Sequence, residues 1–366
     1  MHPRRLAVLS GLAGLLGAQP AMSQPAASAR ASASTAASTA AFDSIVRAEV
    51  AQRQFSGVVL VAEQGKTVFQ AAVGLAGANA PMTEDARFRL ASITKAFAAV
   101  LVMQLVEAQR LRESSTIAEV LPDLKIPRAE QITVHVLLLH RAGSPEEPDA
   151  LYATQRSARA MVLETAKLPY RPYGEFAYAN LDYLVLQLMI EKITGKPFAA
   201  VLQERILTPL GMTHTGMASR ASTGIVQGYL ADSTGRLTPE PSDYVENAGA
   251  AGAMYGTVAD LLRFDQALNG ERLLKKASIA EMYTSHPELG YVAYGSWVYD
   301  YWFLPSSPRV VERRGRSFGF NHTFIRMPGI NKTLIILSNT DRFDPDTFGK
   351  LDSFKDRLIK ALVERP

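Results

Sequence analysis

The pattern of hydrophobic and polar positions changes character several times along the chain. Residues 56–62 (SGVVLVA) and 67–73 are short β-rich runs on either side of Glu63-Gln64-Gly65, and two such runs around a glycine-containing turn predict a β-hairpin. Residues 92–109 are almost wholly apolar. A helix without a polar face is normally enclosed by other elements, so this segment predicts a buried helix.

The remaining pattern predicts helices first and strands afterwards. Helical patterns continue to about residue 220, and that of residues 181–193 ends at Gly195, a typical helix stop. Thr257 and Asp260 can cap the start of another helix. Strand patterns return at 291–303, 322–326 and 333–337, before a C-terminal helix at about 352–363. This order predicts an α+β fold: a mainly antiparallel β-sheet flanked by helices and interrupted by a helical region at about 92–250.

The N-terminal residues differ from the rest in composition. Arg4 and Arg5 precede an apolar run over 6–18, and small residues follow at Ala21 and Ser23. This pattern predicts a secretory signal peptide over 1–23, since the apolar run is shorter than the roughly 20 residues of a spanning helix. Residues 24–41 are rich in Ala, Ser and Thr and predict a disordered leader. We expect one folded domain over 42–366, secreted or periplasmic, without stable membrane insertion.

Composition excludes several classes of function. With 47% hydrophobic residues in 366, the chain can bury a large core, so wholesale disorder is excluded. The net charge of +4 is small and no Lys/Arg-rich block occurs, so we expect no nucleic-acid partner. The absence of cysteine excludes a thiol nucleophile, a thiolate metal site and disulfides. We interpret His135 and His140 as structural, with His140 bonding the loop at Gly143, and we expect no metal or cofactor.

Ser92 and Lys95 open the apolar helix. Residues three apart lie on one helix face about 5–6 Å from each other, so the amine can reach the hydroxyl. A lysine among apolar neighbours can have its pKa lowered enough to activate a serine as a nucleophile. The spacing alone is weak evidence, because an N-cap serine followed by a solvent-facing lysine would produce the same pattern.

A second polar group strengthens this hypothesis. Tyr178-Ala179-Asn180 lies just before the predicted helix at 181–193. A tyrosine there can carry a proton, and an asparagine amide can hold a substrate carbonyl. The alternative is a tyrosine packed under a helix that the asparagine caps.

With these motifs the chain resembles the serine β-lactamase and penicillin-binding-protein superfamily, specifically its class C β-lactamase-like branch, which includes D-alanyl-D-alanine carboxypeptidases, D-aminopeptidases and esterases. The resemblance extends from about Phe42 to the end. Its recurrent segments are found here at 88–95, 132–145, 178–180, 209–212 and 252–264. It implies that Ser92 is the acylated nucleophile, that Lys95 and Tyr178 share the proton transfers, and that Asn180 orients the substrate. Which of Lys95 and Tyr178 is the acylation base stays open.

The third motif of that branch, Lys or His, any residue, then Gly, falls on Arg313-Arg314-Gly315. Arginine keeps the positive charge and can bind a carboxylate through two nitrogens, but it is a poor proton donor. The resemblance implies an oxyanion hole from the backbone amides of Ser92 and Arg316. We therefore expect Arg313, Gly315 and Arg316 to contact substrate and β-lactam turnover to be inefficient. The alternative for the two arginines is a solvated strand edge.

A competing motif is Gly315-x-Ser317-x-Gly319, which matches the nucleophile elbow of α/β hydrolases. That motif needs a following helix and a later acid and histidine, whereas strand patterns follow here, so we assign Ser317 to the site wall. Similarly, the aromatic residues of 291–302 can line a pocket or pack the sheet. The sequence thus predicts an exported serine hydrolase acting on a small molecule or short peptide: a β-lactam, a D-amino-acid peptide or an ester. The alternative function is a catalytically silent protein that binds cell-wall peptides.

Overall fold

A computed structural model describes residues 26–365 except 53 and 242. The predicted signal peptide lies outside the described residues. Helix α1 spans Ala26–Ala51, so residues 26–41 are helical where a disordered leader is expected. Alanine has the highest helix propensity of any residue, and this favours a helical conformation in an Ala-rich segment.

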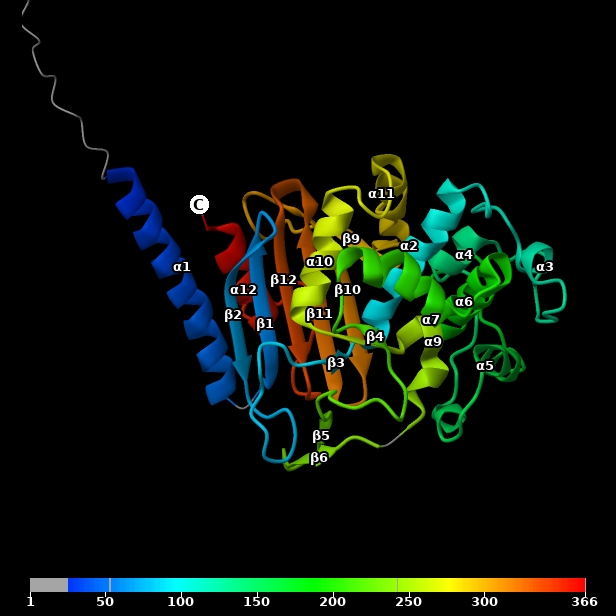
Figure 1. The fold of residues 1–366 in the computed structure, drawn as a ribbon, viewed down its shortest axis with the longest axis horizontal. Helices are drawn as coiled ribbons and strands as arrows, with labels where there is room; N and C mark the ends of the chain where they lie inside the picture. The colour runs from blue at the N-terminus through cyan, green and yellow to red at the C-terminus, as the bar shows by residue number, and fades with distance from the viewer. Residues whose placement is uncertain (1–25, 53, 242, 366) are drawn as a thin grey trace, which may run out of the picture.

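A seven-stranded sheet forms one layer of the molecule, and each of its strand pairs is antiparallel (Figure 1). Its order is β2-β1-β12-β11-β10-β9-β8. The strands are β1 Gly57–Glu63, β2 Lys66–Val73, β8 Val292–Ala293, β9 Ser296–Asp300, β10 Arg309–Ser317, β11 Phe320–Met327 and β12 Lys332–Ser338. The first hairpin and the C-terminal strands are thereby joined through β1 and β12, as an interrupted sheet requires.

Alternation along β1 divides the core between the two faces of the sheet. Val59 and Val61 pack with Phe42 and Leu358 of α1 and α12 (Phe354–Val363) on the outer face. Leu60 packs on the other face with residues of α2 (Thr94–Glu107) and α10 (Val258–Asn269). Because successive side chains of a strand point to opposite faces, a strand covered on both sides is apolar throughout. This explains the uninterrupted GVVLVA pattern.

The helical region lies beyond the β10 side of the sheet, at the right of Figure 1. Helix α2 crosses between the two parts and is buried along most of its length, as its sequence predicts. Helix α6 (Asn180–Thr194) ends at Gly195 with a left-handed φ of 69°. Thr257 caps α10 by accepting from the Asp260 amide, but the Asp260 carboxylate binds His214 and Thr215 instead of completing a capping box.

The other elements are short and connect these parts. The α- and π-helical elements are α3 Ile117–Val120, α4 Val134–Leu138, α5 Ala158–Thr165, α7 Phe198–Leu202, η3 Gln203–Leu207, α8 Thr208–Leu210, α9 Gly249–Gly252 and α11 Lys276–Met282. The 3₁₀ turns are η1 Ala91–Ile93, η2 Asp149–Tyr152, η4 Val245–Ala248, η5 Pro287–Leu289 and η6 Pro328–Ile330. Two small sheets contain β3 Phe88–Arg89, β7 Met254–Gly256 and β4 Gly216–Met217, and β5 Tyr229–Ala231 with β6 Leu237–Pro239.

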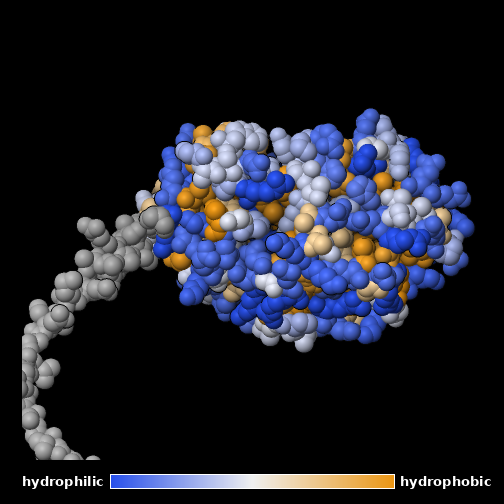
Figure 2. Space-filling model, turned by 90° about the horizontal axis from the view of Figure 1, so that it is seen from above, coloured by the Kyte–Doolittle hydropathy of each residue, from blue (hydrophilic) through white to orange (hydrophobic). Residues whose placement is uncertain are grey.

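Polar side chains cover most of the face seen in Figure 2, with separate apolar patches between them. None of the helices within the described residues combines the length and hydropathy that crossing a bilayer requires. The predicted α+β class, with a mainly antiparallel sheet flanked by helices, is confirmed.

Candidate active site

Ser92 lies in the tight turn η1, at the start of α2. The residue before it, Ala91, has a φ of 47°, a conformation that non-glycine residues rarely adopt and that concentrates at functional sites. Thr94 fixes the turn by donating from its hydroxyl to the Ala91 carbonyl at 2.7 Å. The local backbone is therefore held in a strained form that determines where Ser92 points.

Strand β10 packs directly against this turn. A Cβ atom added to Gly315 would lie 2.5 Å from the Leu90 carbonyl oxygen, which is closer than atoms can approach without displacement. Gly315 is thus needed for the strand to approach the turn that carries Ser92. Arg316 follows it on the strand and lines the same site.

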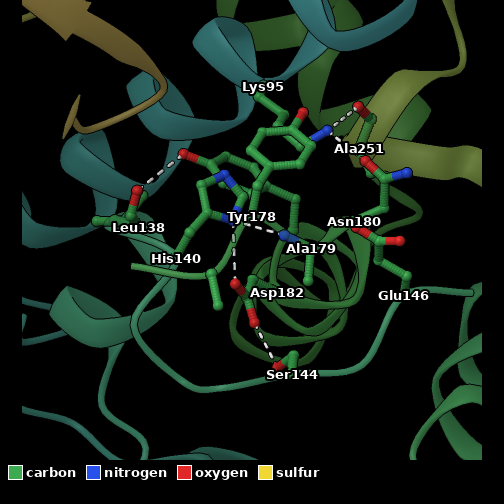
Figure 3. Close-up of polar contacts among 12 residues, drawn as sticks. Lys95, Leu138, His140, Ser144, Glu146, Tyr178, Ala179, Asn180, Asp182 and Ala251 are labelled. Carbon is green, nitrogen blue, oxygen red and sulfur yellow. Dashed lines mark hydrogen bonds and ion pairs between the residues drawn. The ribbon is translucent and has the colours of Figure 1, made fainter. Parts of the chain in front are cut away.

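The structure brings together the four residues of the two sequence motifs. The Lys95 amine donates to Ser92 Oγ at 3.1 Å, and the Tyr178 hydroxyl lies 2.8 Å from the same oxygen. Lys95 also donates to Asn180 Oδ1 at 2.6 Å and to the Ala251 carbonyl at 2.7 Å (Figure 3). The alternative of a solvent-facing lysine is wrong, because Lys95 has an exposed fraction of 0%.

The protonation behaviour of Lys95 follows from this environment. Burial lowers its pKa because the charged form loses hydration, and the positive charge of Arg313 lowers it further. Tyr178 and Glu147 act in the opposite direction. A lysine with a lowered pKa can exchange a proton with its neighbours under mild conditions.

Arg313 lies inside the site and faces Ser92 and Tyr178. It is 3% exposed, so the alternative of a solvated edge is wrong for this arginine. Its Nε donates to the Ser92 carbonyl and its Nη2 to the Tyr178 hydroxyl, both at 2.7 Å. Trp297 stacks against Tyr178, with ring centroids 6.3 Å apart, and the Arg313 guanidinium lies over both rings.

These contacts change the acidity of Tyr178. Burial raises the pKa of its phenol, but the charges of Arg313 and Lys95 outweigh burial and bring the pKa down to about 8. The hydrogen bonds of the phenol with Lys95 and Ser92 lower the pKa as well. A phenol with a pKa near 8 is deprotonated far more often at neutral pH than an ordinary tyrosine, and it is therefore a more effective base. Arg313 therefore acts on Tyr178, and the substrate contact that we expect from it stays a prediction.

A buried polar cluster supports Tyr178 from below (Figure 3). The His140 ring lies 4.4 Å from the Tyr178 ring, and its Nδ1 is 3.0 Å from Asp182, which accepts from Ser144 at 2.6 Å. Burial raises the pKa of Asp182 to about 8 and lowers that of His140 well below its ordinary value. The Ala179 amide also donates to Nδ1 at 3.4 Å. The raised pKa of Asp182 favours its protonated form, which can donate to the Nδ1 of a neutral His140.

Our expectation for the His140 side chain is wrong. Its Nδ1 binds Asp182 and the Ala179 amide, which are 42 and 39 residues away, instead of the loop at Gly143. The Gly143 carbonyl accepts from the Arg171 amide instead. The reason is that α6 lies directly beneath this loop and offers a buried acid to the ring.

Two cavities meet at Ser92. One of about 280 Å³ lies on the Asn180 side and includes Arg316 and Ser317 in its wall. The other, of about 340 Å³, includes Tyr178, Trp297 and Arg313. Strand β10 passes through a short turn into β11, so Ser317 does not occupy a nucleophile elbow. A larger cavity of about 580 Å³, near Tyr229 and Leu237, lies away from these groups.

The sequence did not identify Glu147, Asp182 and Trp297 as members of the site. Trp297 belongs to the aromatic segment 291–302, for which the sequence allows either packing on the sheet or lining a pocket. In the structure Trp297 lies on β9 and also lines the cavity beside Tyr178. Arg314 differs from Arg313, since it forms ion pairs with Glu312 and Asp346. Alternation along β10 is the one signal that separates the two arginines.

Comparisons with known proteins agree with this geometry. The Beta-lactamase family model matches residues 42–353. A penicillin-binding protein of Bacillus subtilis (strain 168) is 26% identical over 321 residues, covering 79% of this chain and 69% of the relative. The esterase EstB of Burkholderia gladioli is 29% identical over 275 residues, covering 63% and 68% of the two chains.

A solved structure is similar over nearly its whole length. The D-amino acid amidase from Ochrobactrum anthropi SV3, complexed with L-phenylalanine amide, superposes with a TM-score of 0.75 at 26% identity, covering 89% of this chain and 98% of that one. The sequence match, the fold and the joined Ser92, Lys95 and Tyr178 lead to one conclusion: the chain belongs to the β-lactamase family and is a serine hydrolase of that family.

Proposed function

We propose that this protein cleaves an amide or ester bond through an acyl-enzyme on Ser92, as class C β-lactamase-like enzymes do. The observation that carries the proposal is that Ser92 Oγ is held by two proton carriers, Lys95 at 3.1 Å and Tyr178 at 2.8 Å. A serine hydroxyl becomes a useful nucleophile only when a neighbouring base takes its proton. Both candidates for that base are within hydrogen-bonding distance.

In acylation, Ser92 Oγ attacks the substrate carbonyl carbon while its proton passes to the Tyr178–Lys95 pair. The tetrahedral intermediate then collapses, the bond to the leaving group breaks, and the same proton goes to the leaving nitrogen or oxygen. Water repeats the sequence on the acyl-enzyme, so that Ser92 is regenerated and the acid is released. No metal or cofactor is required for these steps.

The developing oxyanion requires hydrogen-bond donors beside Ser92. We assign this function to the backbone amides of Ser92 and Arg316, since the close approach of β10 at Gly315 supports such a pair. Asn180 orients the substrate from the other side.

We propose a peptidase or esterase with at most modest β-lactam turnover. Arg313 replaces the Lys or His of the third motif, and its hydrogen bonds to Ser92 and Tyr178 engage it within the site. The similar proteins named as an esterase and an amidase support small amide and ester substrates. Parallel turnover assays with p-nitrophenyl esters, nitrocefin and D-alanyl peptides distinguish these classes.

We also propose export. The support is the pattern of residues 1–23, with two arginines, an apolar run and small residues at Ala21 and Ser23. The mass of the mature protein recovered from its expressing cells should correspond to a start after Ser23. An N-terminus at Met1 in the recovered protein would contradict export by cleavage.

The mass of the intact protein after incubation with a fluorophosphonate or a penicillin tests the mechanism. We expect one covalent adduct on the wild type and none on Ser92→Ala. No adduct with either probe would instead favour the catalytically silent binding protein. An adduct that persists in Ser92→Ala would place the nucleophile elsewhere.

A further inference from the structure

A cavity of about 580 Å³ lies apart from the catalytic groups, beside the β5–β6 hairpin at the lower edge of Figure 1. Its wall is formed by the end of α1, the loop after β2, the β5–β6 hairpin and the segment after β12. None of the described residues that line it also lines the two cavities that meet at Ser92. Small-molecule sites typically measure about 300–1,000 Å³, so this cavity is large enough to hold a ligand of its own.

The wall of this cavity is mainly apolar. Its hydrophobic side chains include Val50, Phe55, Leu75, Leu237 and Pro239. Leu75 and Leu237 are large, and their exposed fractions are 49% and 36%. Exposed apolar groups in a concave wall stay hydrated until another apolar group covers them, and covering them is favourable in proportion to the area removed from water. The wall therefore favours a ligand with a hydrocarbon part.

A buried asparagine holds the segments of the wall together. Asn339 has an exposed fraction of 0%. Its Oδ1 accepts from the Ser56 hydroxyl, and its Nδ2 donates to the Leu75 and Gln227 carbonyls, each at 2.8 Å. Its backbone carbonyl accepts from the Tyr229 amide at 2.9 Å. Because these bonds join the segment after β12 to the other parts of the wall, the cavity is preformed, and a ligand can bind without first ordering it.

The charge of the wall indicates which head group the ligand carries. Among the described residues that line the cavity, Arg342 is the one with a charge, and that charge is positive. Its guanidinium donates to the Gly235 carbonyl in the β5–β6 turn. A guanidinium binds a carboxylate through charge-assisted hydrogen bonds, which are about twice as strong as neutral ones. An apolar wall with one fixed cation thus matches a hydrocarbon chain that ends in an anion.

We propose that this cavity is a second ligand site, which binds a free fatty acid: an amphiphile with one alkyl chain and a carboxylate head. The alkyl chain lies against Leu75 and Leu237, and the carboxylate lies beside Arg342. This site is separate from the Ser92 reaction and does not depend on it.

Isothermal titration calorimetry with free dodecanoate tests the site, at about pH 7.5, where a carboxyl group is ionised. We expect one dodecanoate to bind each protein molecule. Decanoate should bind about ten- to twentyfold more weakly, because each buried methylene changes the affinity about fourfold. Decanol has the same chain as decanoate without the charge and should bind about tenfold more weakly than decanoate. Labelling of Ser92 with a fluorophosphonate before the titration should leave the affinity for dodecanoate unchanged.

Three variants and a control locate the ligand. Leu237→Glu and Leu75→Glu place a carboxylate in the wall from two different segments. Each should weaken dodecanoate binding more than about tenfold, because a carboxylate repels the head group and loses hydration beside an alkyl chain. Leu351→Glu is the matched control, since Leu351 has an exposed fraction of 47% but does not line the cavity. In Arg342→Gln, the ratio of the decanol to the decanoate dissociation constant should fall to about twofold or less.

The outcomes are distinct. The proposal is overturned if dodecanoate does not bind, or if Leu237→Glu and Leu75→Glu both bind it as the wild type does. Equal affinities for decanol and decanoate overturn the carboxylate head group. Loss of binding after Ser92 has been labelled would place the ligand in the catalytic cavities and would also overturn the second site. Failure of the fluorophosphonate to label Ser92 contradicts the proposed function alone, because the comparison of Leu237→Glu with Leu351→Glu still locates the ligand.

Discussion

Replacing Arg313 with methionine tests how the site activates its tyrosine. Methionine has a similar length and fills the buried space, but it lacks the nitrogens that donate to the Tyr178 hydroxyl and the Ser92 carbonyl. Without that charge, burial is opposed mainly by Lys95. We therefore expect the pKa of Tyr178 to rise from about 8 toward its ordinary value of 10.

The size of the effect follows from this shift. A pKa of about 8 leaves about 9% of Tyr178 as phenolate at pH 7, and a pKa of 10 leaves about 0.1%. Two pKa units correspond to about 3 kcal/mol. If the phenolate is the base, the rate constant for acylation at pH 7 should fall about a hundredfold.

The assay is the rate of Ser92 labelling by a fluorophosphonate between pH 6 and 10. A base is active when deprotonated, so the wild-type rate should rise with pH and level off above about 8. In Arg313→Met the pH at which the labelling rate rises should be one to two pH units higher than in the wild type. In Arg313→Lys this increase should be smaller. Arg314→Gln is the matched control, because it changes the adjacent arginine, which pairs with Glu312. If the labelling rate of Arg313→Met rises over the same pH range as that of the wild type, the electrostatic role of Arg313 is refuted.

Three further predictions concern other parts of the site. Lys95→Ala should keep the fold by circular dichroism but slow labelling by about a hundred- to ten-thousandfold, and unchanged labelling would exclude Lys95 as a proton carrier. Asp182→Asn should preserve the bonds to His140 and Ser144. Because the folded pKa of Asp182 lies above its ordinary value, wild-type stability should fall as pH rises from about 4 to 8, so the melting temperature of the variant relative to wild type should increase over that window. If the difference in melting temperature between Asp182→Asn and the wild type stays constant from pH 4 to 8, Asp182 is ionised over the whole range. Gly315→Ala should lower stability by about 1–3 kcal/mol, measured in urea, and turnover by more than tenfold, whereas wild-type turnover would show that the strand can move.

Much of the fold could be predicted from the sequence because it depends on local patterns. The apolar run of β1 and the fully apolar α2 predict buried elements, and both are buried. Gly195 and Thr257 marked a helix end and a helix start through backbone chemistry that involves only neighbouring residues. The Ala-rich composition of residues 24–41 indicates disorder, whereas α1 begins at Ala26, because the high helix propensity of alanine favours a helix there.

The Ser92–Lys95 pair was predictable for the same reason, since three residues of helix determine its geometry. The partners of this pair were not. Arg313 reaches Tyr178 from 135 residues away, and Asp182 reaches His140 from a distance of 42 residues. Alternation along β10 leaves open which arginine faces the site until the sheet has packed against η1.

The sequence by itself therefore determined most of the elements, their order and the pairing of Ser92 with Lys95. Tertiary structure decided the lowered pKa of Tyr178, the raised pKa of Asp182 and the position of Glu147 against Asn180. The physical reason is that backbone conformation depends on neighbours within a few residues, whereas a pKa depends on every charge and every apolar wall that packing brings close.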